Sequence, residues 1–380
     1  MGQSVNSIPP LDLVQQYTSI EAEVSEAVLK VLASGGYIGG SVVKGFEQQF
    51  AAYVGVSECV ACHSGTDALY LALRALEIGD GDEVITVPFT FFATTEVISA
   101  VGATPVFVDI DAATFNLDVQ QLVSAITDKT KAIMPVHLFG QPVDMTAVME
   151  IARAHNLVVI EDCAQSTGAV WAGQRVGSIG NIGCFSFYPT KNLGACGDGG
   201  AVTTNDGAIA AKIRMLKEHG SKQRYIHHEI GINSRLDALQ AAILQIKLRH
   251  LDTWNQQRCA IAQRYHEFLS HIPTVVIPQE LPQGMGVWNQ YTIRLQVSEQ
   301  HDGSYRDTIR KTLQQRGIGT MVYYPLSVHL QPVYQNLGYQ QGQLPVSEQA
   351  CHQVLSLPMF PELSTEQQQQ VIYTLKDCLS

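Results

Sequence analysis

Short apolar runs that alternate with helical stretches limit most strongly how this chain can fold. The apolar runs read, in order, ECVAC, DEVITV, TPVFVDI, KAIMPVH, LVVIEDC, IGCFSF and GAVTT. Helical patterns lie between most of them, at residues 66–76, 94–101, 119–125 and 145–154. Strands that are apolar on both faces and separated by helices form βαβ units around a largely parallel sheet. The sequence therefore predicts an α/β fold.

In the remainder of the chain, strands and helices do not alternate regularly. Helices are expected at 17–33 and 43–53, before the first apolar run, and a long helix is expected from Arg235 to Leu269. Beyond it lie a strand in YTIRLQV, a helix at 305–315, a strand in GTMVYY, and helices at 347–354 and 365–379. A chain of 380 residues exceeds the usual size of one core. We predict a large domain over residues 1–250, which includes an N-terminal arm, and a small C-terminal α+β domain over residues 251–380.

Charge and cysteine content argue against several classes of protein. The formal net charge of -11 argues against a nucleic-acid surface, because phosphates bind to basic faces. No apolar stretch is long enough to cross a bilayer, so we expect no membrane partner and a cytoplasmic protein. Cys59 and Cys62 form one CxxC pair, without the second pair or the spaced histidines that a zinc site needs. We expect reduced, structural cysteines and no metal.

A glycine-rich turn around Lys191 is the first candidate for a functional site. The segment reads FSFYPTKNLGACGDGG and begins in one of the predicted strands. A lysine is ordinarily a solvated surface charge, but neighbouring glycines let a chain turn tightly and let a ligand approach closely. A lysine amine whose pKa is lowered by its surroundings attacks carbonyl groups and forms a Schiff base. We therefore expect Lys191 to be a nucleophile, and we assign no role to Asp198.

Three other strand ends carry unusual residues, and ligands of open parallel sheets bind at such ends. HSGTDAL opens a helix with small hydroxyl side chains, which suits a phosphate, although an ordinary helix cap by Ser64 or Thr66 explains it equally well. The rings of PFTFFAT can stack on a planar ligand or pack in the core. LVVIED ends a buried strand with Glu161 and Asp162. A buried carboxylate needs a partner, which can be a protonated pyridine nitrogen, an internal cation or a helix terminus.

The four strand ends together indicate one cofactor. A phosphate site, a stacking ring, a buried carboxylate and a nucleophilic lysine are what pyridoxal 5'-phosphate requires of a protein. Each feature alone has an ordinary structural explanation. A nicotinamide site fits less well, because GSIGNIG lacks the GxGxxG spacing.

The same motifs carry a resemblance to a known family. SGTDAL, PFTFFAT, EDCAQ, SFYPTKNLGACGDGG and GINSRLDALQAAIL occur in this order. They resemble the sugar-nucleotide aminotransferases of the DegT/DnrJ/EryC1/StrS family over essentially the whole chain. The resemblance implies the type I fold of pyridoxal-phosphate-dependent transferases, which is aspartate aminotransferase-like. It also implies pyridoxal 5'-phosphate as cofactor and a homodimer whose active sites are shared between subunits.

The resemblance also implies roles for individual residues. Lys191 is expected to form the Schiff base and move protons, and Asp162 to pair with the pyridinium nitrogen. The further cofactor contacts that it implies are Gly65, Thr66, Ser186 and a second subunit's Asn233 at the phosphate, Phe91 at the ring, and Gln165 at the 3-hydroxyl. Arg235, Tyr323 and His329 are the implied substrate contacts. An ion pair is the alternative for Arg235, and the family's proline near Ser327 is missing here.

The function that we expect from this resemblance is transamination. L-Glutamate would give its amino group, leaving 2-oxoglutarate, and the keto group of a UDP- or dTDP-linked sugar would accept it. We favour a 3-keto over a 4-keto sugar, in the biosynthesis of amino sugars and polysaccharides. Two alternatives are a dehydratase of the same family, which carries histidine in place of Lys191, and a catalytically silent regulatory protein that binds nucleotide sugars.

Overall fold

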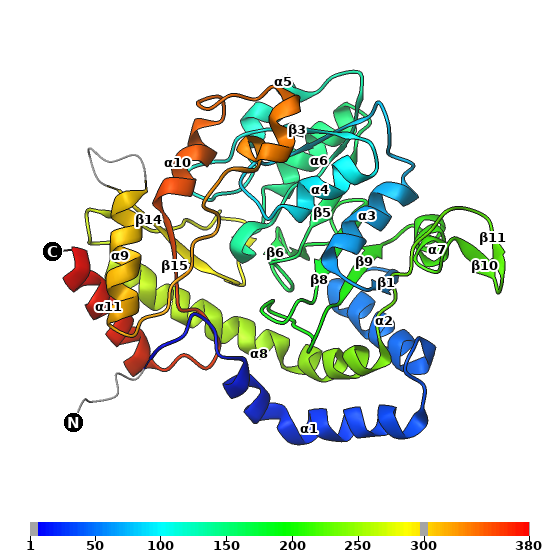
Figure 1. Ribbon diagram of the computed structural model, residues 1–380, viewed down its shortest axis with the longest axis horizontal. Coiled ribbons are helices and arrows are strands. Elements are labelled where there is room, and N and C mark those ends of the chain that lie inside the picture. The colour runs from blue at the N-terminus through cyan, green and yellow to red at the C-terminus, as the bar shows by residue number, and fades with distance from the viewer. Residues whose placement is uncertain (1–6, 297–302, 380) are drawn as a thin grey trace.

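A seven-stranded sheet forms the centre of the protein, whose computed structural model describes residues 7–296 and 303–379 (Figure 1). The strand order is β1-β9-β8-β5-β4-β2-β3. The strands are β1 (Glu58–Cys62), β2 (Glu83–Thr86), β3 (Thr104–Phe107), β4 (Thr130–Ile133), β5 (Val158–Asp162), β8 (Ile182–Ser186) and β9 (Gly200–Thr204). Each of them coincides with a predicted apolar run, except that β4 begins one residue earlier, so the sequence-based strand assignment of the sheet is confirmed.

The sheet is parallel except at one side. The pairs from β8 through β5, β4 and β2 to β3 are parallel, whereas β9 runs antiparallel to both β8 and β1. A parallel neighbour requires a crossover connection, usually a helix, but β8 and β9 are joined only by the turn that carries Lys191. That turn therefore lies at the edge where β5 and β8 end.

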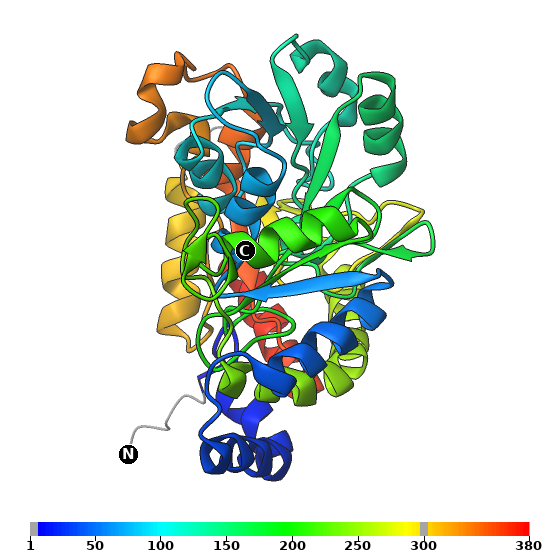
Figure 2. The same cartoon turned by 90° about the vertical axis from the view of Figure 1, so that its right-hand side faces the viewer.

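Helices cover both faces of the sheet. On one face, α2 (Gly40–Val54) and α8 (Ala238–Leu269) enclose Phe46, Phe50 and Phe185 in an apolar core. The helices packed into the core of the other face are α3 (Gly65–Ala75), α4 (Ala93–Ala100) and α7 (Gly207–Leu216). Figure 2 shows α2 in blue and α8 in yellow-green on one side of β1, with α7 in green on the other. The predicted α/β arrangement is confirmed.

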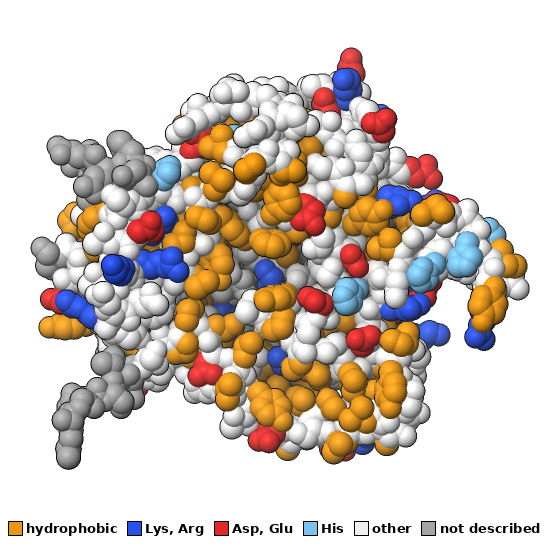
Figure 3. Space-filling view, in the orientation of Figure 1, with side chains coloured by type: hydrophobic (Ala, Val, Ile, Leu, Met, Phe, Trp, Pro, Cys, Tyr) orange, Lys and Arg blue, Asp and Glu red, His pale blue; other side chains and the backbone are white. Residues whose placement is uncertain are grey.

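Helix α1 (Leu13–Ser34) lies outside this layer and packs against α8 through Ile20, Val24 and Ile243. It begins at the Asp12 cap and ends at Gly35, whose left-handed φ of 66° suits glycine. The helix also carries large apolar side chains that stay exposed, namely Leu13, Val14, Tyr17, Leu29 and Leu32. We call these five residues the α1 patch; in Figure 3 hydrophobic side chains gather over α1.

A second, smaller core follows α8. The sheet β12-β14-β15 carries it, with strands Val275–Val276, Tyr291–Leu295 and Val354–Leu357. The helices around it are α9 (Ser304–Gln315), α10 (Pro345–Gln353) and α11 (Thr365–Leu379). The strand predicted in GTMVYY is wrong, because only Met321 in that segment pairs with a strand residue, Ser356. The third strand is instead β15, which lies directly after α10 and begins at Val354, the last residue of the helix expected at 347–354.

The remaining elements are short. They comprise α5 (Leu122–Ala125), α6 (Met145–Ala154), the sheet of β13 (Gly284–Met285), β6 (Val170–Trp171) and β7 (Gln174–Arg175), and the hairpin of β10 (Ser221–Gln223) and β11 (Ile226–His227). The 3-10 helices are Val119–Gln121, Leu138–Gly140, Val328–Leu330 and Pro332–Leu337. The β10–β11 hairpin projects from the body of the molecule (Figure 1). No helix in the described part of the chain has the length and apolar character needed to span a bilayer.

Helix α8 connects the two cores. Its first half contributes Ala241 and Leu244 to the core of the large sheet, and its second half contributes Ile261 and Tyr265 to the smaller core. The domain boundary predicted between residues 250 and 251 falls inside this continuous helix. The division into two domains at that point stays a prediction.

Candidate active site

Lys191 lies in the turn between β8 and β9, and its backbone N–H donates to the carbonyl oxygen of Tyr188 over 2.9 Å. The side chain is partly buried. Within residues 7–296 and 303–379, its amine forms no hydrogen bond or ion pair with another side chain. Burial lowers the pKa of Lys191 from 10.5 to about 8, while the charge of Asp162 opposes the shift. The amine is therefore more readily available as a nucleophile than that of a surface lysine.

Asp162 ends β5 and is 4% exposed. Its Oδ2 accepts a hydrogen bond from Thr94 Oγ1 over 2.8 Å, and its Oδ1 accepts one from the Ala164 N–H over 3.1 Å. Burial raises the pKa of Asp162, and these two hydrogen bonds counteract the shift. No described lysine, arginine or histidine forms an ion pair with Asp162. The carboxylate is thus held in place but lacks a cationic partner.

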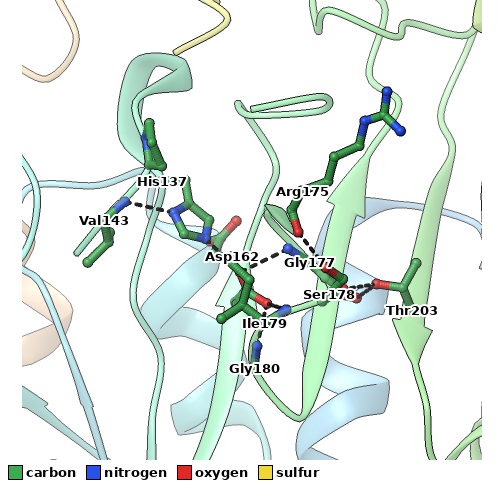
Figure 4. A network of polar contacts seen from close by, with 12 residues as sticks. His137, Val143, Asp162, Arg175, Gly177, Ser178, Ile179, Gly180 and Thr203 are labelled. Atoms are coloured by element: carbon green, nitrogen blue, oxygen red, sulfur yellow. Dashed lines mark hydrogen bonds and ion pairs between the residues drawn. The ribbon is translucent and has the colours of Figure 1, made fainter. Parts of the chain in front are cut away.

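Glu161 has the opposite surroundings, although it is the preceding residue. Its side chain is fully buried, and four donors surround its carboxylate. They are the N–H groups of Gly177, Ile179 and Gly180, at 2.7 to 2.9 Å, and His137 Nε2 at 3.1 Å (Figure 4). His137 Nδ1 accepts from the Val143 N–H, so Nε2 carries the proton that binds Glu161. The internal partner considered for the two carboxylates is therefore observed at Glu161.

The Glu161 cluster has the composition of a metal site but a different bonding pattern. His137, Glu161 and Cys163 offer ligand atoms within 4.8 Å of one another. Each carboxylate oxygen of Glu161 already accepts two hydrogen bonds, and both ring nitrogens of His137 are engaged. These contacts are those of a structural network.

The start of α3 meets the end of β8. Ser64 caps the helix by accepting from the Asp67 N–H over 3.0 Å, so the ordinary cap considered for HSGTDAL is present. A Cβ on Gly65 would lie 2.6 Å from the Cβ of Ser186, which means that only glycine fits at this close approach. Gly65, Thr66 and Ser186 are thereby brought together at a helix N-terminus, where free N–H groups favour an anion.

The rings of the aromatic segment after β2 differ in their exposure to solvent. Phe89 is completely buried in the core, whereas Phe91 is 58% exposed. The ring centroid of Phe91 lies 6.4 Å from that of Tyr324. Gln165 is buried nearby, with its Oε1 accepting from the Phe139 N–H over 2.7 Å and its Nε2 donating to the Tyr324 hydroxyl over 3.1 Å. Phe91 is open to a ligand, and Gln165 is oriented by protein contacts.

Asn233 and Arg235 lie next to the β10–β11 hairpin. Asn233 is exposed, and the Ser234 hydroxyl that follows it donates to Asp67 Oδ2 over 2.6 Å. Arg235 Nη1 lies 3.0 Å from Glu218 Oε2, so the ion pair considered for Arg235 is present in the single chain. Both residues stay at the surface, where a second subunit or a ligand can reach them.

The two predicted substrate contacts of the C-terminal part differ in accessibility. Tyr323 lines a cavity of about 290 Å³ together with Thr190 and Asn289. His329 is 2% exposed, its Nδ1 lies 2.8 Å from Ser327 Oγ, and its Nε2 lies 3.2 Å from Glu348 Oε1. With both nitrogens engaged and no open surface, His329 has the contacts of a structural histidine, and the ligand role predicted for it has no support in this geometry.

Sequence reasoning missed three residues around Lys191 and Asp162. Thr94 binds Asp162, Tyr324 binds Gln165, and Asn289 donates through Nδ2 to Asn192 Oδ1 over 2.9 Å, directly beside Lys191. Only Thr94 left a signal, as the hydroxyl residue that ends the aromatic segment PFTFFAT. The other two come from distant segments that the fold brings close.

The residues at this edge of the sheet fit pyridoxal 5'-phosphate. The close approach of Gly65 to Ser186 leaves the α3 N-terminus open to a phosphate. The Asp162 carboxylate lacks a cation, and the Lys191 amine lacks a hydrogen-bonding partner among the described residues. This set of groups matches the phosphate, the ring nitrogen and the aldehyde of the cofactor.

Comparison with known proteins agrees with this geometry. A sequence profile of the DegT/DnrJ/EryC1/StrS aminotransferase family matches residues 18–376. The chain belongs to this family. Its structure superimposes on that of S. venezuelae DesV in complex with a ketimine intermediate, with a TM-score of 0.94 and 44% identity over 98% of this chain and 99% of the other. The family membership and the aminotransferase fold expected from the motifs are confirmed.

Curated relatives of this aminotransferase bear two kinds of name. A "Pleiotropic regulatory protein" of Geobacillus stearothermophilus is 50% identical and spans 96% of this chain and 97% of its own length. A UDP-N-acetyl-3-dehydro-alpha-D-glucosamine 3-aminotransferase of Acidithiobacillus ferrooxidans is 46% identical, with 95% of each chain covered. Similarity alone thus connects this aminotransferase to relatives named as regulators and to relatives named as enzymes.

Proposed function

We propose that this aminotransferase uses pyridoxal 5'-phosphate to move the amino group of L-glutamate to the keto group of a nucleotide-linked sugar. One observation carries the proposal: a partly buried lysine of lowered pKa and a buried carboxylate without a cation occupy the same edge of the sheet. Neither arrangement is needed for folding, because burying charge without a partner is unfavourable. Both are needed for chemistry on this cofactor.

Lys191 and Asp162 take the catalytic roles. When bound, pyridoxal 5'-phosphate supplies an electron sink and a carbonyl carbon that accepts an amine. Asp162 keeps the ring nitrogen protonated by placing a carboxylate beside it. Lys191 Nζ binds the cofactor and later removes the proton from the α-carbon of the amino acid. Gly65, Thr66 and Ser186 hold the phosphate, and Phe91 and Gln165 orient the ring.

The acceptor is proposed to be a 3-keto sugar nucleotide. Relatives of 40% to 46% identity carry names that describe a 3-amino or 3-dehydro sugar linked to dTDP or UDP. Arg235, at the surface, and Tyr323, which lines the cavity beside Thr190, are the groups that we assign to substrate contact. The product would serve amino-sugar or polysaccharide biosynthesis in the cytoplasm.

The working form is proposed to be a homodimer. The α1 patch exposes large apolar side chains near both ends of α1, including Val14 at 76% and Leu29 at 63%, which is typical of a surface that another protein covers. The β10–β11 hairpin projects from the body of the molecule, and Asn233 is exposed, so a second copy can approach both. Each active site would then receive Asn233 from the second copy.

The test measures both half-reactions with purified protein. Incubation with pyridoxal 5'-phosphate and L-glutamate should yield pyridoxamine phosphate and 2-oxoglutarate, quantified by chromatography. Addition of 3-keto and 4-keto sugar nucleotides should then return the cofactor to its starting form, faster with the 3-keto compound. Lys191→Ala should lower the rate by on the order of 10³-fold, because the proton-transfer group is lost. Exposed Lys311→Ala, on α9 and away from the α1 patch, is the control.

Two outcomes would contradict the proposal. Full turnover by Lys191→Ala would show that the lysine is not the catalytic amine. Tight binding of a nucleotide sugar without any pyridoxamine phosphate from glutamate would favour a regulatory protein, in line with the name of the Geobacillus relative. Loss of water from the sugar without amine transfer would favour the dehydratase.

A further inference from the structure

A short chain of buried hydroxyl groups ends on Asp162. Thr90 Oγ1 lies 2.9 Å from Thr94 Oγ1, and Thr94 Oγ1 lies 2.8 Å from Asp162 Oδ2. The three side chains are 3%, 1% and 4% exposed, respectively, so bulk water does not compete for these contacts. An ionised carboxylate only accepts hydrogen bonds, and each hydroxyl has one proton to give. The direction is therefore from Thr90 to Thr94 to Asp162.

We propose that Thr94 is a positioning residue of the aminotransferase, whose hydroxyl holds the ionised Asp162 carboxylate toward the cofactor's ring nitrogen. The inference rests on the proposed function, because it takes Asp162 to be the partner of that nitrogen. Thr94 itself contacts neither substrate nor cofactor in this assignment.

The contacts of Asp162 show why one hydroxyl has this influence. Oδ1 accepts a hydrogen bond from the Ala164 N–H in the segment after β5, and Oδ2 accepts one from Thr94 in α4. Donors from two different elements therefore hold the carboxylate. Two donors on different oxygens fix the rotation of the carboxylate plane. The titratable side chains near Asp162 are Lys191 and His137, and neither forms an ion pair with it. Loss of Thr94 would free Oδ2 and leave it buried.

Helix α4 provides a matched control at the next position. Thr95 is also buried, but its hydroxyl donates to the Phe92 carbonyl oxygen over 3.0 Å and has no contact with Asp162. Thr94→Val and Thr95→Val thus remove the same hydroxyl from neighbouring buried sites. Thr94→Ser keeps a hydroxyl at position 94 and serves as the rescue variant.

The experiment compares cofactor binding and the state of the cofactor in these variants. Apoprotein is titrated with pyridoxal 5'-phosphate by absorbance, and the protonation of the ring nitrogen is read from the ¹⁵N chemical shift of ¹⁵N-labelled cofactor. Thr94→Val should weaken binding about tenfold or more, as expected for a lost hydrogen bond to a charged group, and should shift the ¹⁵N signal toward the unprotonated nitrogen. Thr94→Ser should restore both readings, and Thr95→Val should leave both as in the wild type.

Several outcomes would overturn the inference. Binding and ¹⁵N shift that are equal in Thr94→Val and Thr95→Val would show that the hydroxyl has no positioning role. If Thr94→Val does not fold, Thr90→Val decides, since it removes only the donor to Thr94. A smaller change in the same direction supports the inference, and no change overturns it. Wild-type protein that binds no cofactor would instead refute the proposed function, and this inference with it.

Discussion

The residues Glu161 and Asp162 show how neighbours in a chain acquire different chemistry. Side chains alternate between the faces of a strand, so the two carboxylates of β5 point into different surroundings. The Glu161 carboxylate accepts four hydrogen bonds. The Asp162 carboxylate accepts two and can accept more. The run LVVIED alone did not distinguish the two carboxylates, and the family resemblance assigned the functional role to Asp162. The loop at Gly177 to Gly180 shows why Glu161 is structural.

The lowered pKa of Lys191 leads to a prediction about its reactivity. In the cofactor-free protein, the amine should be protonated below about pH 8 and neutral above it, rather than changing near 10.5. The rate of modification by an amine-specific reagent, followed at Lys191 by mass spectrometry, should therefore rise with a midpoint near pH 8. Asp162→Asn removes the negative charge that favours the ammonium, so the midpoint should move to still lower pH.

A matched variant checks the cause of that shift. Asp198→Asn, in the same turn, changes one charge without removing the carboxylate that interacts with Lys191, and the midpoint should stay near 8. A midpoint that does not move in Asp162→Asn would contradict the electrostatic coupling of the two residues.

At the scale of elements, the contact between α3 and β8 determines whether an anion can approach the helix N-terminus. Gly65→Ala should press a methyl group against Ser186, since the new Cβ would lie 2.6 Å from the Ser186 Cβ. Such overpacking typically costs about 1–3 kcal/mol of stability. We expect a lower urea midpoint and cofactor binding weakened at least about tenfold, a displacement of about 1.4 kcal/mol in binding free energy.

Gly207→Ala is the control for this prediction. Gly207 is also the first residue of a helix, α7, but a Cβ there would meet nothing within 4 Å. Its variant should keep the wild-type urea midpoint and cofactor affinity. Equal behaviour of the two variants would show that the contact between α3 and β8 does not limit the site.

Elements also show what sequence patterns can and cannot predict. The strands of the large sheet were predictable because each is a run of apolar residues bounded by turns. β15 was missed because its four residues follow α10 without a break, and periodicity cannot separate a short strand from a helix end. The contacts of Thr94 and Asn289 depend on which segments meet in space, and local sequence does not contain that information.

At the scale of the whole molecule, the α1 patch predicts the state of association. The wild-type protein should sediment at twice the chain mass of 41.5 kDa, because a dimer would cover the patch. Leu29→Glu places a charge within that patch, at one of its most exposed residues, and should shift the protein toward the monomer. Light scattering coupled to size-exclusion chromatography measures the mass directly.

Tyr373→Glu is the comparison for this experiment. Tyr373 is 75% exposed on α11, a helix that packs on the smaller core, and it does not belong to the α1 patch. This variant should keep the mass of the wild type. A dimer that persists in Leu29→Glu, or a wild-type monomer, would show that the α1 patch is not the contact surface.

Helix α8 has a consequence for anyone who recombines members of this family. Because it contributes side chains to both cores without interruption, a chimeric gene joined at residue 250 would combine half a helix from each parent. Arg258, in the second half, donates to the carbonyl oxygens of Trp288 and Met359, so this half is also tied to the smaller core. Exchanges of specificity between relatives should therefore place their crossover points outside Ala238–Leu269, where a foreign segment brings its own partners.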